Sequence, residues 1–238
     1  MFALTALLRS AAGPAFAARP VQPFPHQSLN VAGGCLVESI YFYDQCRERL
    51  GDDAWVRVLQ WGAKEDDEVV AGHAVAVFAL ADRLWAWDVN FGFVPLGVPV
   101  AQREDVELVS RPILARYPKI TPRDPVYRLD FPQAAAAGPF PAPRLEEDGV
   151  VRDACVVAEK LGRHRPVNLV EFAYIESGER RRGAAVVFLF HGRYCVYSPP
   201  RGTVPFHARG SVQNLRLVQE ALRRMFPGAF AVKPLGGD

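Results

Sequence analysis

The chain has 238 residues, of which 50% are hydrophobic and 23% charged, a composition typical of a globular protein with a sizeable core. Its formal net charge is +2, so charge gives no argument for binding nucleic acid or a membrane surface. Beyond the N-terminal segment, no stretch approaches the roughly 18 consecutive apolar residues that a membrane-spanning helix needs. The length allows one large domain or two small ones.

The cysteine pattern gives no indication of a metal site. Cys35, Cys46, Cys155 and Cys195 form no Cys-x-x-Cys pair and have no metal-ligand spacing with the five histidines. We therefore expect no structural zinc, no other metal and no cofactor. Two disulfides are compatible with the count, but the spacing does not indicate them.

The N-terminal segment, residues 1–24, has two interpretations. A short apolar run ending in Ala15-Phe16-Ala17 would suit cleavage of a secretory signal, although Arg9 interrupts the run and no basic residue precedes it. The other interpretation is a loosely packed N-terminal arm. We expect a cytoplasmic protein, and a secreted or periplasmic one if residues 1–18 are a signal peptide.

The next elements alternate in a way that predicts an α+β fold with helix and antiparallel sheet. Apolar residues over 36–50 have helical spacing, and Gly51 is placed to end this helix. An apolar strand over 55–61 follows. Strands over 73–80 and 84–88 are rich in Val, Phe and Trp and form a hairpin. An amphipathic helix over 104–117 completes this unit.

The second part of the chain repeats the first. Segment 182–206 aligns with segment 72–96 without a gap, 110 residues apart, and Trp87 falls on Tyr197. The match extends upstream and downstream, where Pro118 falls on Pro227. This interval is too long for a solenoid and indicates a duplicated domain, with chance resemblance as the alternative.

The predicted domain boundaries follow from this repeat. The first copy occupies 25–130, a Pro/Ala-rich linker occupies 131–143, and the second copy occupies 144–238, ending in a clear amphipathic helix over 211–226.

Three residues of the first copy form a candidate catalytic triad. Cys35 follows two glycines at the start of a helix, where the helix dipole favours a thiolate. His73 and Asp88 lie on the two strands of the hairpin, and an even-length turn at Ala81-Asp82 would put them on one face of the sheet. A thiolate nucleophile, a base and an orienter of that base need these three residue types.

The oxyanion formed by thiolate attack needs hydrogen-bond donors. We expect the backbone N–H of Cys35 to supply one, and the side chain of Asn30 or Gln27, just upstream, to supply the other.

The motifs His-Ala-Val-Ala-Val-Phe and Trp-Ala-Trp-Asp-Val-Asn-Phe-Gly resemble the histidine strand and the aspartate segment of YopT-type cysteine peptidases, a branch of the papain-like clan. That family is also similar in having an asparagine five residues before its catalytic cysteine, which matches Asn30. The resemblance implies papain-like units and cleavage of a peptide or protein substrate through Cys35, His73 and Asp88. The family has proline where this chain has Val89.

Two other functions stay open from the sequence. Transglutaminase-like proteins share the same order of residues, which would mean acyl transfer to an amine. A non-enzymatic scaffold with a decayed papain-like fold is the other alternative. The second copy has Gly183 at the histidine position, Ser198 at the aspartate position and Glu146 near the cysteine position, so we expect it to be non-catalytic.

Overall fold

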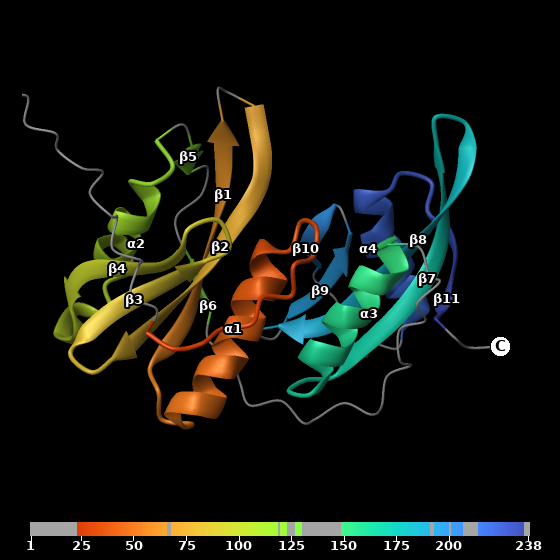
Figure 1. Ribbon diagram of the computed structural model, residues 1–238. Coiled ribbons are helices and arrows are strands. Elements are labelled where there is room, and N and C mark those ends of the chain that lie inside the picture. The colour runs from red at the N-terminus through yellow and green to blue at the C-terminus, as the bar shows by residue number, and fades with distance from the viewer. Residues whose placement is uncertain are drawn as a thin grey trace, which may run out of the picture.

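The computed structural model describes residues 23–65, 68–118, 120–122, 127–129, 149–190, 193–199, 201–206 and 214–235. Over these residues the fold is α+β, with four α-helices and two antiparallel sheets, as the sequence predicts (Figure 1). Residues 1–22 of the N-terminal segment, the linker over 131–143 and Glu146 lie outside the described residues.

The first half of the chain builds the first sheet. Its strands are ordered β4-β3-β2-β1-β5, and β6 also pairs with β1. The elements are α1 (Cys35–Leu50), β1 (Val56–Glu65), β2 (Glu68–Leu80), β3 (Arg83–Asp88), β4 (Gly92–Pro99), a 3₁₀ turn (Val100–Gln102), α2 (Val106–Leu114), β5 (Ile120–Pro122) and β6 (Tyr127–Leu129).

The second half builds the second sheet in the same order, β10-β9-β8-β7-β11. The register also corresponds, since Val56 lies opposite Phe78 in the first sheet and Val167 lies opposite Phe188 in the second. The elements are α3 (Gly149–Gly162), β7 (Val167–Glu176), β8 (Glu179–Phe190), β9 (Arg193–Ser198), β10 (Gly202–Phe206), α4 (Leu215–Met225) and β11 (Phe230–Pro234).

The helix boundaries follow local capping. The first helix ends before Gly51, whose φ of +92° suits glycine, so the predicted stop is confirmed. The predicted helix over 104–117 is too long, because the side chain of Asp105 caps α2 by accepting a hydrogen bond from the Leu108 N–H at 2.9 Å. At the other end, Tyr117 lies in a turn beyond α2. In the same way Asn214 caps α4.

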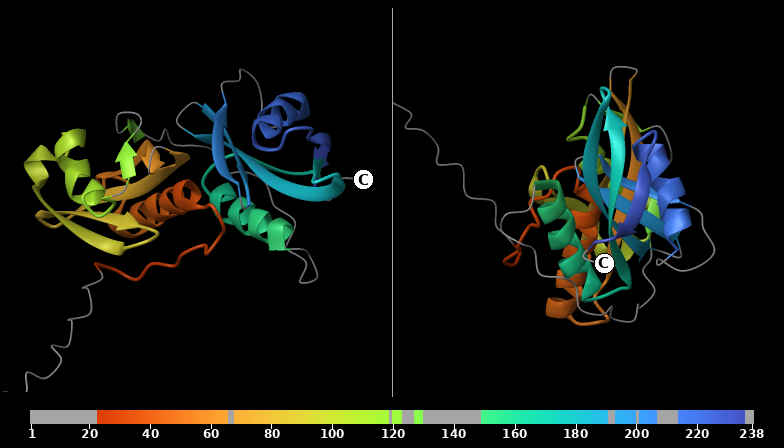
Figure 2. Two further views of the ribbon diagram at one scale, coloured as in Figure 1. Left: turned by 90° about the horizontal axis from the view of Figure 1, so that it is seen from above. Right: turned by 90° about the vertical axis from the view of Figure 1, so that its right-hand side faces the viewer.

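The two halves share one core. Helices α1 and α3 contact each other and each covers the inner face of its own sheet, while α2 and α4 cover the outer faces (Figure 2). A buried ion pair crosses this interface, where Arg165 Nη2 lies 2.5 and 2.7 Å from the carboxylate oxygens of Asp44. The halves therefore pack as one body around the α1–α3 contact.

None of the described helices is long and apolar enough to cross a membrane.

Candidate functional site

Cys35 is the first residue of α1 and is half-buried. The chain reaches it through a tight turn in which Gly33 has a φ of +64°. A Cβ atom at Gly34 would lie 2.7 Å from Val31 Cγ2, so that position needs glycine. The two glycines thus allow the chain to turn sharply into the helix and present the thiol at the helix N-terminus.

The segment before this turn is held by the fully buried Glu38 of α1. Its carboxylate accepts hydrogen bonds from Ser28 Oγ at 2.7 Å, from the Asn30 N–H at 2.7 Å and from the Leu29 N–H at 3.0 Å. Three donors satisfy a carboxylate that would otherwise be costly to bury. This arrangement fixes the approach of the chain to Cys35.

His73 and Asp88 come together as the sequence predicts. The turn between β2 and β3 has two residues, because Leu80 pairs with Arg83. His73 Nε2 then lies 3.1 Å from Asp88 Oδ2. The side chain of Asp88 is 0% exposed and that of His73 is 11% exposed, so the pair is shielded from water.

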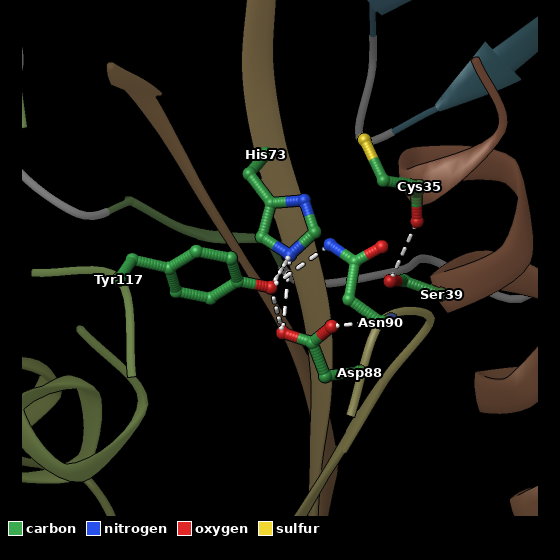
Figure 3. Close-up of polar contacts among 6 residues, drawn as sticks. All are labelled: Cys35, Ser39, His73, Asp88, Asn90 and Tyr117. Carbon is green, nitrogen blue, oxygen red and sulfur yellow. Dashed lines mark hydrogen bonds and ion pairs between the residues drawn. The ribbon is translucent and has the colours of Figure 1, made fainter. Parts of the chain in front are cut away.

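A residue that sequence reasoning missed, Tyr117, completes this network (Figure 3). Its hydroxyl donates to Asp88 Oδ2 at 2.7 Å and lies 2.9 Å from His73 Nε2. Asn90 contributes twice, through its side-chain Nδ2 to the Tyr117 hydroxyl at 3.1 Å and through its backbone N–H to Asp88 Oδ1 at 2.7 Å. Both oxygens of the buried carboxylate are therefore satisfied.

The network keeps the histidine charged. Burial by itself would lower the pKa of His73, but hydrogen bonds and charge interactions with Asp88 and Cys35 outweigh burial and raise it to about 9. For Asp88, burial would raise the pKa, but the hydrogen bonds and charge of His73, with the Tyr117 and Asn90 donors, lower it. At neutral pH the pair is thus an imidazolium and a carboxylate.

This pairing has a defined pH dependence. Because the pKa of His73 is raised above its usual 6.5, its contribution to folding is complete below about pH 6.5 and is lost as pH rises through about 9. Its size is on the order of 3 kcal/mol, from 1.36 kcal/mol per pKa unit.

Cys35 lies on the other side of the imidazole. The ring nitrogen that does not face Asp88 and Tyr117 points toward the Cys35 thiol (Figure 3). A hydrogen bond and charge interaction with Cys35 contribute to the raised pKa of His73. One ring nitrogen therefore serves the carboxylate and the other serves the sulfur, which is the division that thiolate–imidazolium chemistry requires.

A cavity of about 370 Å³ opens in front of Cys35 and His73. The two predicted oxyanion donors, Gln27 and Asn30, do not line it, and both residues are exposed. Gln60 of β1 lines the cavity instead. The walls come from three parts of the chain: the turn and first residues of α1 (Val31, Gly33, Gly34, Cys35, Leu36), the first sheet (Gln60, His73, Ala74, Val89, Asn90) and the second half (Arg201, Gly202, Thr203).

The corresponding place in the second half is filled with apolar atoms. Gly183 pairs with Phe172, as His73 pairs with Trp61, and a Cβ at Gly183 would lie 2.4 Å from Phe172 Cζ. The aromatic ring thus occupies the space next to the backbone. Ser198 is buried and donates a hydrogen bond to a backbone carbonyl, that of Ala184, at 2.7 Å. No triad is formed at these positions.

Among the described residues, no three His, Cys, Asp or Glu side chains are grouped as metal ligands would be. All four cysteines lie in described segments, and none of them forms a disulfide.

Comparisons with known proteins give no family to the chain: no protein-family model matches it, and neither a curated protein nor a solved structure matches it.

Proposed function

We propose that the protein is a thiol hydrolase of the papain-like type, most simply a cysteine peptidase, with Cys35 as nucleophile, His73 as base and Asp88 as orienter. The observation that carries this proposal is the division of the His73 ring between Asp88, with its hydroxyl partner Tyr117, and the Cys35 thiol at the start of a helix. An imidazole that only stabilised the core would not need a buried carboxylate on one side and an accessible thiol on the other.

The chemistry follows from these positions. The Cys35 thiolate attacks the acyl carbon, a C–S bond forms, and the carbonyl oxygen takes the electron pair. The C–N bond then breaks, and the His73 imidazolium gives its proton to the leaving amine. A water molecule attacks the thioester, His73 accepts the water proton, and the acid leaves as the Cys35 thiolate is restored. Asp88 and Tyr117 hold the ring in place throughout.

The oxyanion donors in this proposal are the Cys35 N–H and the side-chain amide of Gln60. The first N–H groups of a helix point out of its N-terminal end, and Cys35 is the first residue of α1, so its N–H is directed toward this end. Gln60 lies on β1 opposite Ala74, next to His73, and lines the cavity. It takes the role that the sequence suggested for Asn30 or Gln27.

The proposal includes tandem duplication. Two sheets with the same strand order, the corresponding register at Val56–Phe78 and Val167–Phe188, and the ungapped alignment support an origin of both halves from one papain-like unit. The second unit then lost the catalytic groups, and Phe172 filled the space.

The experiment is to incubate the folded protein with a peptide library and quantify new amino termini by mass spectrometry. A peptidase releases them, and the release stops in Cys35→Ala. A parallel reaction with a labelled amine and a glutamine peptide detects acyl transfer of the transglutaminase type. If neither reaction occurs with folded protein, the thiol-hydrolase proposal is wrong and the scaffold function replaces it.

A further inference from the structure

The non-catalytic half forms one wall of the cavity that contains Cys35 and His73. Arg201, Gly202 and Thr203, which lead into and begin β10, line this cavity together with the residues at the start of α1. The second half therefore contributes to the space in which a substrate would bind, although it has none of the triad residues.

Strand β10 and its neighbour β9 are fixed against the turn that carries Cys35. The Tyr197 hydroxyl on β9 donates to the Ala32 carbonyl at 2.8 Å. Gly202 has a φ of +82°, and a Cβ there would lie 3.1 Å from the Gly33 carbonyl oxygen. Two backbones thus approach closely at this point, and the position of β10 relative to the thiol is set by direct contact.

The outer side of β10 is an edge of the second sheet, as far as the described residues show. Within the described residues β10 is an edge strand whose partner is β9. Pro205 lies opposite Cys195, and because proline has no N–H, its nitrogen suits a position that faces away from β9. Thr203, two residues earlier in a regular ladder, has the same orientation, so its N–H and C=O also face away from β9.

Thr203 also has a buried side-chain hydroxyl, for which the described residues supply no hydrogen-bond partner. Buried polar groups are normally paired, so this hydroxyl could accept or donate one secondary hydrogen bond to a molecule bound in the cavity. The main-chain groups of the same residue point to the kind of ligand that would do so.

We propose that the substrate is an extended polypeptide segment that adds to β10 as a further strand, pairing with the N–H and C=O of Thr203 and so placing its acyl carbon at Cys35. This inference rests on the proposed function. An exposed edge next to a catalytic cavity binds a peptide in this way through main-chain hydrogen bonds, with little dependence on side chains. The degenerate half is then the substrate platform of the enzyme.

The test uses acetyl-tetra-alanyl chloromethyl ketone, which forms a thioether with the Cys35 sulfur and releases chloride. Chloroacetone, with the same reactive group and no peptide, reports the thiol alone. We expect the peptide reagent to label Cys35 about tenfold faster than chloroacetone, as two ordinary main-chain hydrogen bonds allow. N-methylation of one internal amide of the peptide should remove most of that advantage.

Thr203→Pro tests the strand from the protein side, because it removes one N–H without disturbing the pairing to β9. The ratio of peptide to chloroacetone labelling rates should fall about threefold to tenfold, whereas Thr203→Val, which keeps the main chain, should retain most of the ratio. Should Thr203→Pro fail to fold, the N-methylated peptides on the wild-type protein carry the same test.

The docking inference is overturned if the peptide reagent is no faster than chloroacetone, if N-methylation has no effect at any position, or if folded Thr203→Pro keeps the wild-type ratio. If the proposed function itself is wrong, the outcome differs: chloroacetone then labels another cysteine in preference to Cys35.

Discussion

The two halves of the chain have the same strand order and corresponding register, but they differ at one position of the sheet, which is His73 in the first half and Gly183 in the second. In the first half, His73 lies beside Trp61 and reaches a buried carboxylate. In the second half, Gly183 has no side chain, and the ring of Phe172 packs directly against its backbone. At this position the second half has apolar packing in place of the polar network of the first half.

The difference lies in the polar network of the first half. The buried carboxylate of Asp88 is paired with His73, Tyr117 and the Asn90 backbone N–H. The buried hydroxyl of Ser198 is paired with one backbone carbonyl. A buried carboxylate is costly unless it is fully paired. Since the second half folds without such a group, the fold does not depend on it, and its presence in the first half points to function.

Removal of the Cys35 sulfur should have the largest effect on activity. Cys35→Ala should abolish peptide cleavage, because the acyl intermediate of the proposed mechanism forms on this sulfur. Ser198→Ala, at the position that corresponds to Asp88 in the second half, is the matched control and should leave the rate unchanged. Both are measured by the release of amino termini from the peptide library. Activity that survives in Cys35→Ala would refute the role of the first half.

Asp88→Asn should reduce kcat/KM by on the order of a thousandfold, because the charge that holds His73 as an imidazolium is lost. The pKa of His73, raised to about 9 in the native protein, should fall in this variant, since Asp88 contributes both a hydrogen bond and a charge to that shift. The pH profile of the rate and an NMR titration of His73 measure the two effects. An unchanged profile would mean that Asp88 does not orient the ring.

Gly183→Ala tests the contact between Gly183 and Phe172 in the second half. The added Cβ would lie 2.4 Å from Phe172 Cζ, so we expect a loss of about 1–3 kcal/mol in the free energy of unfolding. Gly149→Ala is the control, because nothing lies within 4 Å of a Cβ there. Urea denaturation measures both. Equal stability of the two variants would show that Phe172 does not fill the space tightly.

Tyr117→Phe should have a smaller effect, about tenfold on kcat/KM, as the loss of a hydrogen bond to a charged group allows. The Tyr117 hydroxyl helps to lower the pKa of Asp88, so the acid limb of the pH profile should move to higher pH in this variant. Tyr174→Phe, in the second half, is the control. A drop in rate without any shift in the profile would indicate a structural role only.

The sequence was sufficient for those parts of the site that depend on local patterns. Alternation and a two-residue turn brought His73 and Asp88 to one face, and the glycines placed Cys35 at the start of a helix. Tyr117 could not be found in this way, because its position depends on where α2 ends and how that helix packs. In the sequence alignment, Tyr117-Pro118 and Phe226-Pro227 differ by one hydroxyl, which gives no sign of a role for Tyr117.

The residues that line the cavity could be identified only from the tertiary structure. The Asn30 backbone is bound to Glu38, a long-range contact that spacing does not reveal, and the side chains of Gln27 and Asn30 do not reach the cavity. Gln60 lines it because β1 lies next to β2. Thr203 comes from the other half of the chain, and only the packing of the halves brings it to Cys35.

Competitive alkylation measures whether Cys35 and His73 act as one reactive unit. Limiting iodoacetamide at neutral pH, read by mass spectrometry, should modify Cys35 first, because it lies at a helix start beside an imidazole. The other three cysteines are buried, and burial raises the pKa of the Cys46 thiol. His73→Ala should slow the modification of Cys35 markedly. Preferential labelling of another cysteine, or an unchanged rate at Cys35 in His73→Ala, would contradict the claim.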